Sequence, residues 1–196
     1  TDAETLDIAR MVLVGKVNRD IVGSINVHGP LAVGVSGEDG GLITAAARNP
    51  ELGFVGDVAS VDPTLLTKLF SEGLIPVMST IGADASGQAY NINADTVAGA
   101  VAEAIGAEKV VYLTDVEGLY EDFSDKNSLI RQISANELQG KIDSGRVTDG
   151  MIPKIEACIS AVNNGVTSAH LLDGRIPHVA LLEIFTDAGI GTMISS

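Results

Sequence analysis

The chain has 196 residues, 45% of them hydrophobic, which suffices for one large α/β domain or one and a half smaller ones around a substantial core. Its 12 Lys and Arg against 26 Asp and Glu give a net charge of −14, so neither nucleic acid nor an anionic membrane is expected as a partner. The single cysteine, Cys158, excludes an intrachain disulfide and is expected to be buried and inert. With no apolar run near the roughly 20 residues that span a bilayer, and no signal-like start, we expect a cytoplasmic protein.

Helical and strand patterns alternate along the sequence. An opening helix is predicted over 1–25, where Thr1 and Glu4 match a capping box. Another helix follows Asp62 and Pro63, which resemble a cap and a first-turn proline. Strands are predicted over 31–36, 54–58, 75–80, 109–115, 167–173 and 191–195, and further helices over 96–107, 134–145, 153–165 and 177–185. This alternation favours a mostly parallel sheet covered by helices on both faces.

Ligands in such folds collect at the carboxyl ends of the strands, and two glycine-bearing connections lie there. The strand 109–115 ends in Thr114 and Asp115 and is followed by a turn at Gly118. Asp115 could serve a ligand, or it could cap the turn. The loop 33–43 carries three glycines, Gly37, Gly40 and Gly41, that could hold a phosphate on backbone N–H groups. A tight turn is the simpler explanation.

Lys154 follows Pro153 in the opening turn of a predicted helix. A cation there opposes the helix dipole, at a cost of up to about 1 kcal/mol, unless an anion occupies the site. We therefore expect an anionic ligand near Lys154.

Asn91, Asn93 and Asp95 stand two apart in YNINAD, between an apolar strand and an apolar helix. On an extended backbone the three side chains would share one face. Asn93 or Asp95 could simply cap the helix that begins near Thr96, which would account for one of the three. Amides suit a carboxylate or an acetamido group, and an aspartate beside a lysine can keep that lysine charged. An anionic substrate that meets a phosphate donor would explain these features together.

Five segments carry a resemblance to a known family. They are NINAD (91–95), YLTDVEGLY (112–120), DGMIPKIEA (149–157), SAHLLDGR (168–175) and EIFTDAGIGTMI (183–194). In this order and spacing they resemble the C-terminal two-thirds of N-acetyl-L-glutamate kinases of the amino-acid kinase family. The resemblance implies phosphorylation of the γ-carboxylate of N-acetyl-L-glutamate by ATP with Mg²⁺, in arginine biosynthesis.

The family fold implied is a three-layer αβα sandwich with a mostly parallel central sheet. By this resemblance, residues 1–95 are the remaining part of an N-terminal substrate and dimerisation lobe. Residues 96–196 are a C-terminal nucleotide lobe that also carries elements of an arginine site. A homodimer is implied, with a hexamer in the intact enzyme.

The resemblance also implies roles for individual residues. Asn91 and Asn93 would bind N-acetyl-L-glutamate, Asp95 would orient the catalytic lysines, and Lys154 would stabilise the phosphoryl group in transit. The ATP site would be lined by Thr114, Asp115, Val116, Glu117, Gly118, Leu119, Tyr120, Arg146, Val147, Thr148, Gly150 and Met151. Feedback inhibition by L-arginine would use His170, Glu183 and Gly189. Without the resemblance, Glu183 is better explained as a solvated charge at a helix end. No residue is assigned as a metal ligand.

The sequence departs from the family at its front. Family members begin with a Lys-x-Gly-Gly strand, a His-Gly-Gly-Gly-Pro loop and a substrate-binding arginine, none of which precedes Thr1. We therefore expect a truncated enzyme in which the N-terminal part of the fold is missing and turnover by this chain alone is absent. The alternatives are an inactive module that binds nucleotide or arginine, and a carbamate or uridylate kinase of the same superfamily.

Overall fold

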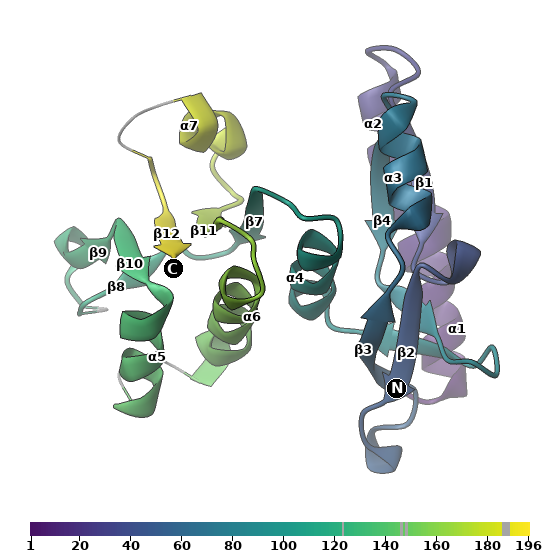
Figure 1. Cartoon of the computed structure of the whole chain (residues 1–196), viewed down its shortest axis with the longest axis horizontal. Coiled ribbons are helices and arrows are strands. Elements are labelled where there is room, and N and C mark those ends of the chain that lie inside the picture. The colour runs from purple at the N-terminus through teal and green to yellow at the C-terminus, as the bar shows by residue number, and fades with distance from the viewer. Residues whose placement is uncertain (123, 146, 148, 186–188) are drawn as a thin grey trace. The chain divides into compact units, whose positions relative to one another are not determined.

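The protein is described by a computed structural model that covers residues 1–122, 124–145, 147, 149–185 and 189–196. It divides into two compact units, Thr1–Ile105 and Gly106–Ser196 (Figure 1). The predicted lobe boundary after residue 95 falls at the start of a helix, Ala94–Ala104 (α4), that belongs to the first unit. Among the described residues no helix is long and apolar enough to cross a membrane.

The first unit opens on a long helix that contains a π-helical segment. The helix runs through Ala3–Arg10 (α1), the π-helical Met11–Val17, and Asn18–Asn26 (α2). Asp2 is the N-cap and accepts a hydrogen bond from the backbone N–H of Thr5 at 2.8 Å, so the predicted capping box of Thr1 and Glu4 was wrong. An aspartate accepts this bond through its short carboxylate without help from a partner three residues on.

Two strand groups complete the first unit. Strands Ala32–Ser36 (β1) and Ile75–Ser79 (β4) pair in parallel, and α2 and Thr64–Ser71 (α3) pack on them. Ile43–Ala47 (β2), Val55–Val61 (β3), Ala89–Ile92 (β6) and Ile81–Ala83 (β5) pair in a closed ring. β2 was not predicted as a strand, because its three alanines carry no strand signal beside the β-branched Ile43 and Thr44.

The side chain of Asn18 links the long helix to the parallel strands β1 and β4 through hydrogen bonds. Its side chain is 3% exposed, and its Nδ2 donates to the carbonyl oxygens of Val77 in β4 at 2.7 Å and Val35 in β1 at 3.4 Å. A buried amide that bonds both strands fixes the helix over them, because leaving those groups unpaired costs free energy. The apolar core beneath is formed by Val35, Leu42, Ile43, Ala45, Leu66, Ile92 and Val97.

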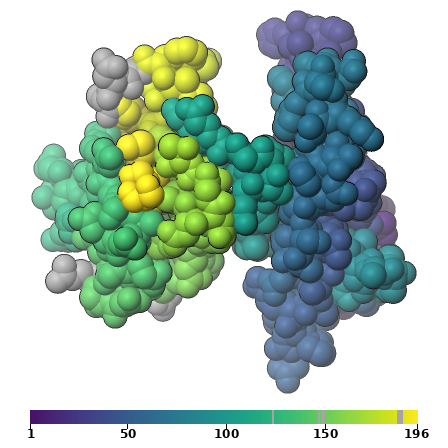
Figure 2. All heavy atoms as spheres, viewed as in Figure 1, coloured from purple at the N-terminus to yellow at the C-terminus, as the bar shows by residue number. Residues whose placement is uncertain are grey.

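The second unit is built on one four-stranded sheet in the order β10, β12, β11, β7. These strands are Gln132–Ser134 (β10), Thr192–Ser195 (β12), Ser168–Asp173 (β11) and Lys109–Thr114 (β7), and only the β11–β12 pairing is antiparallel. Helices Ala135–Asp143 (α5) and Ile152–Asn163 (α6) pack on each other, and α6 also packs on β11 and β12. In Figure 2 the yellow end of the chain lies at the surface between the green segment that contains α5 and the lime α6.

Smaller elements surround this sheet. Leu119–Tyr120 (β8) and Leu129–Ile130 (β9) form a two-stranded antiparallel ribbon, and Val179–Phe185 (α7) packs on β11. The predicted capping box of Ser134 and Glu137 at the start of α5 is confirmed, as is the burial of Cys158. The expected α/β class, with parallel strand pairs and covering helices, is also confirmed.

Candidate functional site

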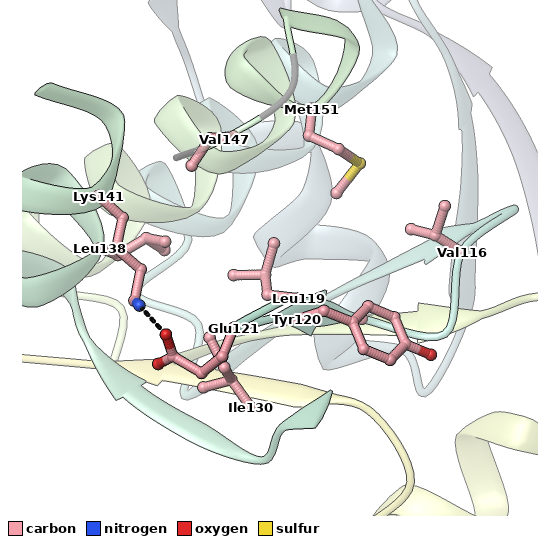
Figure 3. A pocket seen from close by; sticks show the side chains of 10 residues that line it. Val116, Leu119, Tyr120, Glu121, Ile130, Leu138, Lys141, Val147 and Met151 are labelled. Carbon is pink, nitrogen blue, oxygen red and sulfur yellow. Dashed lines mark hydrogen bonds and ion pairs between the residues drawn. The ribbon is translucent and has the colours of Figure 1, made fainter. Parts of the chain in front are cut away.

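A hollow in the second unit collects residues from four short segments (Figure 3). The segments are the turn after β7 with β8, strand β9, helix α5, and the residues just before α6. The lining residues are Val116, Gly118, Leu119, Tyr120, Glu121, Ile130, Leu138, Lys141, Val147 and Met151. Six of the residues predicted for nucleotide binding lie among them: Val116, Gly118, Leu119, Tyr120, Val147 and Met151.

Thr192 on β12 holds one wall of this pocket in place. It is fully buried, its Oγ1 accepts from the backbone N–H of Leu119 at 2.9 Å, and it donates to the carbonyl oxygen of Ile130 at 2.6 Å. Gly118 passes so close that a Cβ there would lie 2.6 Å from Thr192 Oγ1, at a φ of +148° that side chains avoid. The central strand thus positions both strands of the β8–β9 ribbon through one hydroxyl.

The turn that leads from β7 to the pocket is closed by Thr114. Its Oγ1 accepts from the N–H of Val116 at 2.9 Å and donates to the carbonyl oxygen of Val116 at 3.1 Å. Asp115 is exposed beside it, so the role of closing the turn falls to the threonine. Glu117 accepts a hydrogen bond from the Tyr120 hydroxyl, which together with burial raises the pKa of that hydroxyl.

The neighbouring strand end carries an ion pair. Asp173, at the end of β11, pairs in register with Thr114 on β7, and both of its oxygens accept from the Arg175 guanidinium at 2.8 Å. The hydrogen bonds from Arg175 lower the pKa of Asp173 to about 2. A carboxylate fixed in this way stays charged at any physiological pH.

Lys154 lies in the first turn of α6, as predicted. Met151, which lines the pocket, is the N-cap residue of that helix, and Lys154 follows it three residues later. Gly150 belongs to the short 3₁₀ turn Asp149–Met151 that precedes the helix. One turn of chain thus provides a pocket wall and a cation at a helix start that favours anions. Arg146 and Thr148, also predicted for the nucleotide, lie outside the described residues.

In the first unit the predicted polar row does not form on one extended face. Strand β6 ends at Ile92 and α4 begins at Ala94, so Asn91 lies in the strand and Asp95 in the helix. Asn93 is the N-cap, and its Oδ1 accepts from the backbone N–H groups of Asp95 at 2.9 Å and Thr96 at 3.2 Å. The capping explanation therefore holds for Asn93, because its oxygen is used at the helix start.

The glycine loop of the first unit is a tight turn. Asp39 closes it by accepting from the backbone N–H of Ser36 at 2.7 Å, and Gly37 runs so close to β5 that a Cβ would lie 2.5 Å from the carbonyl oxygen of Ile81. Gly40 and Gly41 both have positive φ. The simpler of the two sequence interpretations accounts for all three glycines.

The three residues predicted for arginine come together in the second unit. His170 on β11 is 5% exposed, with Nδ1 at 2.8 Å from Glu183 Oε1 and Nε2 at 2.9 Å from Ser168 Oγ. The other oxygen of Glu183 accepts from the N–H of Ile190 at 2.8 Å, and a Cβ on Gly189 would meet that oxygen at 3.2 Å. The interpretation of Glu183 as a solvated helix-end charge was wrong, because its side chain is only 9% exposed and pairs with His170.

The pKa of Glu183 reflects two opposing influences. Burial raises it, while hydrogen bonds from Ile190 and His170 lower it further, so the net pKa lies below the ordinary value for glutamate. A partly buried carboxylate that stays charged beside an imidazole is suited to receive a cationic group.

Four pocket residues were not predicted from the sequence: Glu121, Ile130, Leu138 and Lys141. The capping box of α5 could have located two of them, because a helix that begins after Ser134 places Leu138 and Lys141 three apart on one face. Within the described part of the chain, no three His, Cys, Asp or Glu side chains gather as a metal site.

Comparison with known proteins decides the family. Residues 1–173 match the Amino acid kinase family. The chain belongs to the amino acid kinase family. Among its relatives is the acetylglutamate kinase of Nostoc sp. (strain PCC 7120 / SAG 25.82 / UTEX 2576), 55% identical over 195 residues, which make up 99% of this chain. The chain spans 66% of that relative's length, slightly under two-thirds.

Solved structures support the same fold. The N-acetylglutamate synthase of Neisseria gonorrhoeae, complexed with coenzyme A and N-acetyl-glutamate, has a TM-score of 0.87 and 25% identity, over all of this chain and 45% of that one. A carbamate kinase from Giardia has a TM-score of 0.72 at 11% identity, over 95% of this chain and 70% of the other. The second likeness shows the fold alone.

Proposed function

We propose that this chain is part of an acetylglutamate kinase, an enzyme that phosphorylates the γ-carboxylate of N-acetyl-L-glutamate with ATP and Mg²⁺ in arginine biosynthesis. The observation that carries the proposal is the turn Met151–Lys154, which joins a wall of the pocket to a lysine at a helix start. The 55% identity to a protein named acetylglutamate kinase supports this acceptor over carbamate or uridylate.

The chemistry asks for positioning and charge neutralisation. A carboxylate and a triphosphate repel each other, so cationic groups must spread the charge while both are held in line. We assign Lys154 to the transferred phosphoryl group and Asp95 to the orientation of lysines. Asn91, together with the amide nitrogen of Asn93, is assigned to the substrate, since the Asn93 oxygen already caps α4. N-acetyl-glutamate in the synthase structure supports that choice of substrate class.

ATP is assigned to the pocket of the second unit, and Mg²⁺ would bind there as a complex with the ATP phosphates. Mg²⁺ is usually held by one or two carboxylates plus substrate phosphate oxygens, so a preformed cluster of three side chains is not required. The predicted residues outside the pocket wall, Thr114, Asp115, Glu117 and Gly150, are assigned to the phosphate side of the nucleotide. A homodimer, a hexamer in the intact enzyme and a cytoplasmic location complete the proposal.

Substitution of Lys154 tests the assignment. In the intact enzyme, Lys154→Ala should lower kcat by about 10²-fold or more and change the KM for N-acetyl-L-glutamate little, because the charge acts mainly in the transition state. The assay is acetylglutamate-dependent ADP release, with Lys68→Ala on the exposed face of α3 as the matched control. A large KM change at near-normal kcat would remove Lys154 from this role.

A second function, binding of L-arginine, is favoured by the cluster of His170, Glu183 and Gly189. Glu183 is held charged next to an imidazole and a backbone N–H, with its side chain 9% exposed. This chain could provide that binding without turnover, so calorimetry with L-arginine should detect it even where ADP release is absent. Retained affinity in Glu183→Gln would argue against this site.

A further inference from the structure

The pocket of the second unit has two apolar sides and one charged end. Figure 3 shows Val147 and Met151 on one side and Leu119, Tyr120 and Ile130 on the other. Such facing walls suit a flat aromatic ring, because both ring faces are then removed from water.

Lys141 and Glu121 form the charged end. Lys141 Nζ lies 2.6 Å from Glu121 Oε2, with the lysine side chain 19% exposed and that of Glu121 58% exposed. The ammonium carries three N–H donors and Glu121 accepts one of them, while the carboxylate has two oxygens. The end of the pocket therefore presents an acceptor directly beside a donor.

That pattern matches one edge of adenine. In an adenine nucleotide the 6-amino group is the base's N–H donor, and a ring nitrogen acceptor lies on each side of it. A carboxylate would face the amino group while the ammonium donates to the adjacent nitrogen. The 6-amino edge of the base is thus the edge that this pair would meet.

A second hollow lies beyond the pair. It is lined by Glu121, Ile130, Gln132, Ile133, Glu137, Gly140, Lys141 and Ser144, so it shares Glu121, Ile130 and Lys141 with the first. Both members of the ion pair therefore border both hollows. We expect truncation of either side chain to open the first hollow toward the second.

We propose that the Lys141–Glu121 ion pair is the specificity wall of the nucleotide pocket, which contacts the 6-amino edge of adenine and excludes bases that carry a bulky group there. This inference rests on the proposed function, since it takes the pocket to be the ATP site. It adds two specificity-determining residues, Lys141 of α5 and Glu121, which directly follows β8.

A substituted nucleotide tests the wall directly. By calorimetry on the full chain, the wild type should bind ATP at least about tenfold more tightly than N6-benzyl-ATP, because the pair blocks the benzyl group. Lys141→Ala and Glu121→Ala should each bring N6-benzyl-ATP to within about threefold of ATP, since the benzyl group can then enter the second hollow. Alanine favours helix, so Lys141→Ala keeps α5 intact, and circular dichroism verifies folding of both variants.

The matched control is Lys126→Ala, an exposed lysine of the same unit that lines neither hollow. It should keep the wild-type preference for ATP. Equal binding of both nucleotides by the wild type, or an unchanged preference in both pair variants, would overturn the inference and leave the proposed function standing. Failure of every variant and of the wild type to bind any purine nucleotide would overturn the proposed ATP site, and this inference with it.

Discussion

The parallel strand pairs of the two units differ in how deeply they are buried. In the second unit every residue of β11 is buried, including three polar ones, Ser168, His170 and Asp173. In the first unit the paired strands β1 and β4 are only partly buried, and the long helix beside them leaves large apolar side chains exposed, among them Met11 at 65%.

The difference shows where a rigid site can be built. Polar groups on a fully buried strand need partners inside the protein, and those partners fix their positions. His170 and Asp173 each have such partners, one in Glu183 and the other in Arg175. In the first unit Asn93 is satisfied by its own helix start, so its geometry depends on local chain structure.

The largest effect is expected inside the buried strand. Leu171→Ala should lower the free energy of unfolding of the second unit by about 2–5 kcal/mol, because the fully buried leucine leaves a cavity. Denaturant unfolding measures it, with Val111→Ala on β7 as the control. Val111 is 36% exposed, so its substitution should cost well under that amount. Equal losses of unfolding free energy in the two variants would mean that Leu171 on β11 and Val111 on β7 are equally buried.

The next effect concerns the buried polar partner. Glu183→Gln should destabilise the second unit by about 1–3 kcal/mol, because His170 and the Ile190 N–H lose a charged acceptor.

The same variant has a pH signature. The folded pKa of Glu183 is lowered, so its stabilisation is complete above the unfolded pKa of about 4.3 and is lost as pH falls through the lower folded value. Wild type should therefore lose stability across that acid window, and Glu183→Gln should lose less. If both proteins lost the same amount of stability across this pH range, the pairing of Glu183 with His170 would be contradicted.

A smaller effect is expected at the local cap of the first unit. Asn93→Ala should cost about 1 kcal/mol, since the backbone N–H groups of Asp95 and Thr96 lose their acceptor. Asn93→Asp should retain most of this stability because aspartate caps equally well. Hydrogen exchange of the α4 amides reports it, and unchanged protection in Asn93→Ala would refute the cap.

The smallest effect on folding is expected on the exposed helix face. Met11→Ser should change the free energy of unfolding by no more than about 0.5 kcal/mol, because the side chain is already in water. It should nevertheless reduce self-association, measured by sedimentation, since an exposed apolar face promotes contact between copies. A large loss of stability would show that Met11 is covered in solution.

Local signals predicted much of this fold. The strand β11 and the Ser134 capping box were found because a short strand-like segment between glycines and an S-x-x-E motif each depend on neighbouring residues alone. Strand β2 was missed since its alanines carry no strand signal, and the Thr1 capping box was wrong because Asp2 competes for the same N–H groups.

The candidate site was predicted where its motifs are contiguous and missed where it depends on distant contacts. The turn 114–120 was located through a strand that ends in polar residues. Glu121 and Lys141 form a hydrogen-bonded ion pair although they lie twenty residues apart in the sequence. Nothing in either residue's own segment indicates the other as its partner. His170 and Glu183 also meet through the packing of α7 on β11, and they were predicted together only because of the family resemblance.

The π-helical segment Met11–Val17 would allow the long helix to lose one residue without moving its buried side chains. A π turn holds one residue more than an α turn, so the segment stores a spare residue between Leu6, buried on one side, and Asn18, buried on the other. Removal of one residue there would restore ordinary α geometry and leave both anchors facing the strands. A deletion elsewhere in the helix would rotate one anchor by about 100°, a single residue's share of a 3.6-residue turn. The molecule thus has a place in its first helix where the deletion of one residue can be absorbed without repacking the sheet.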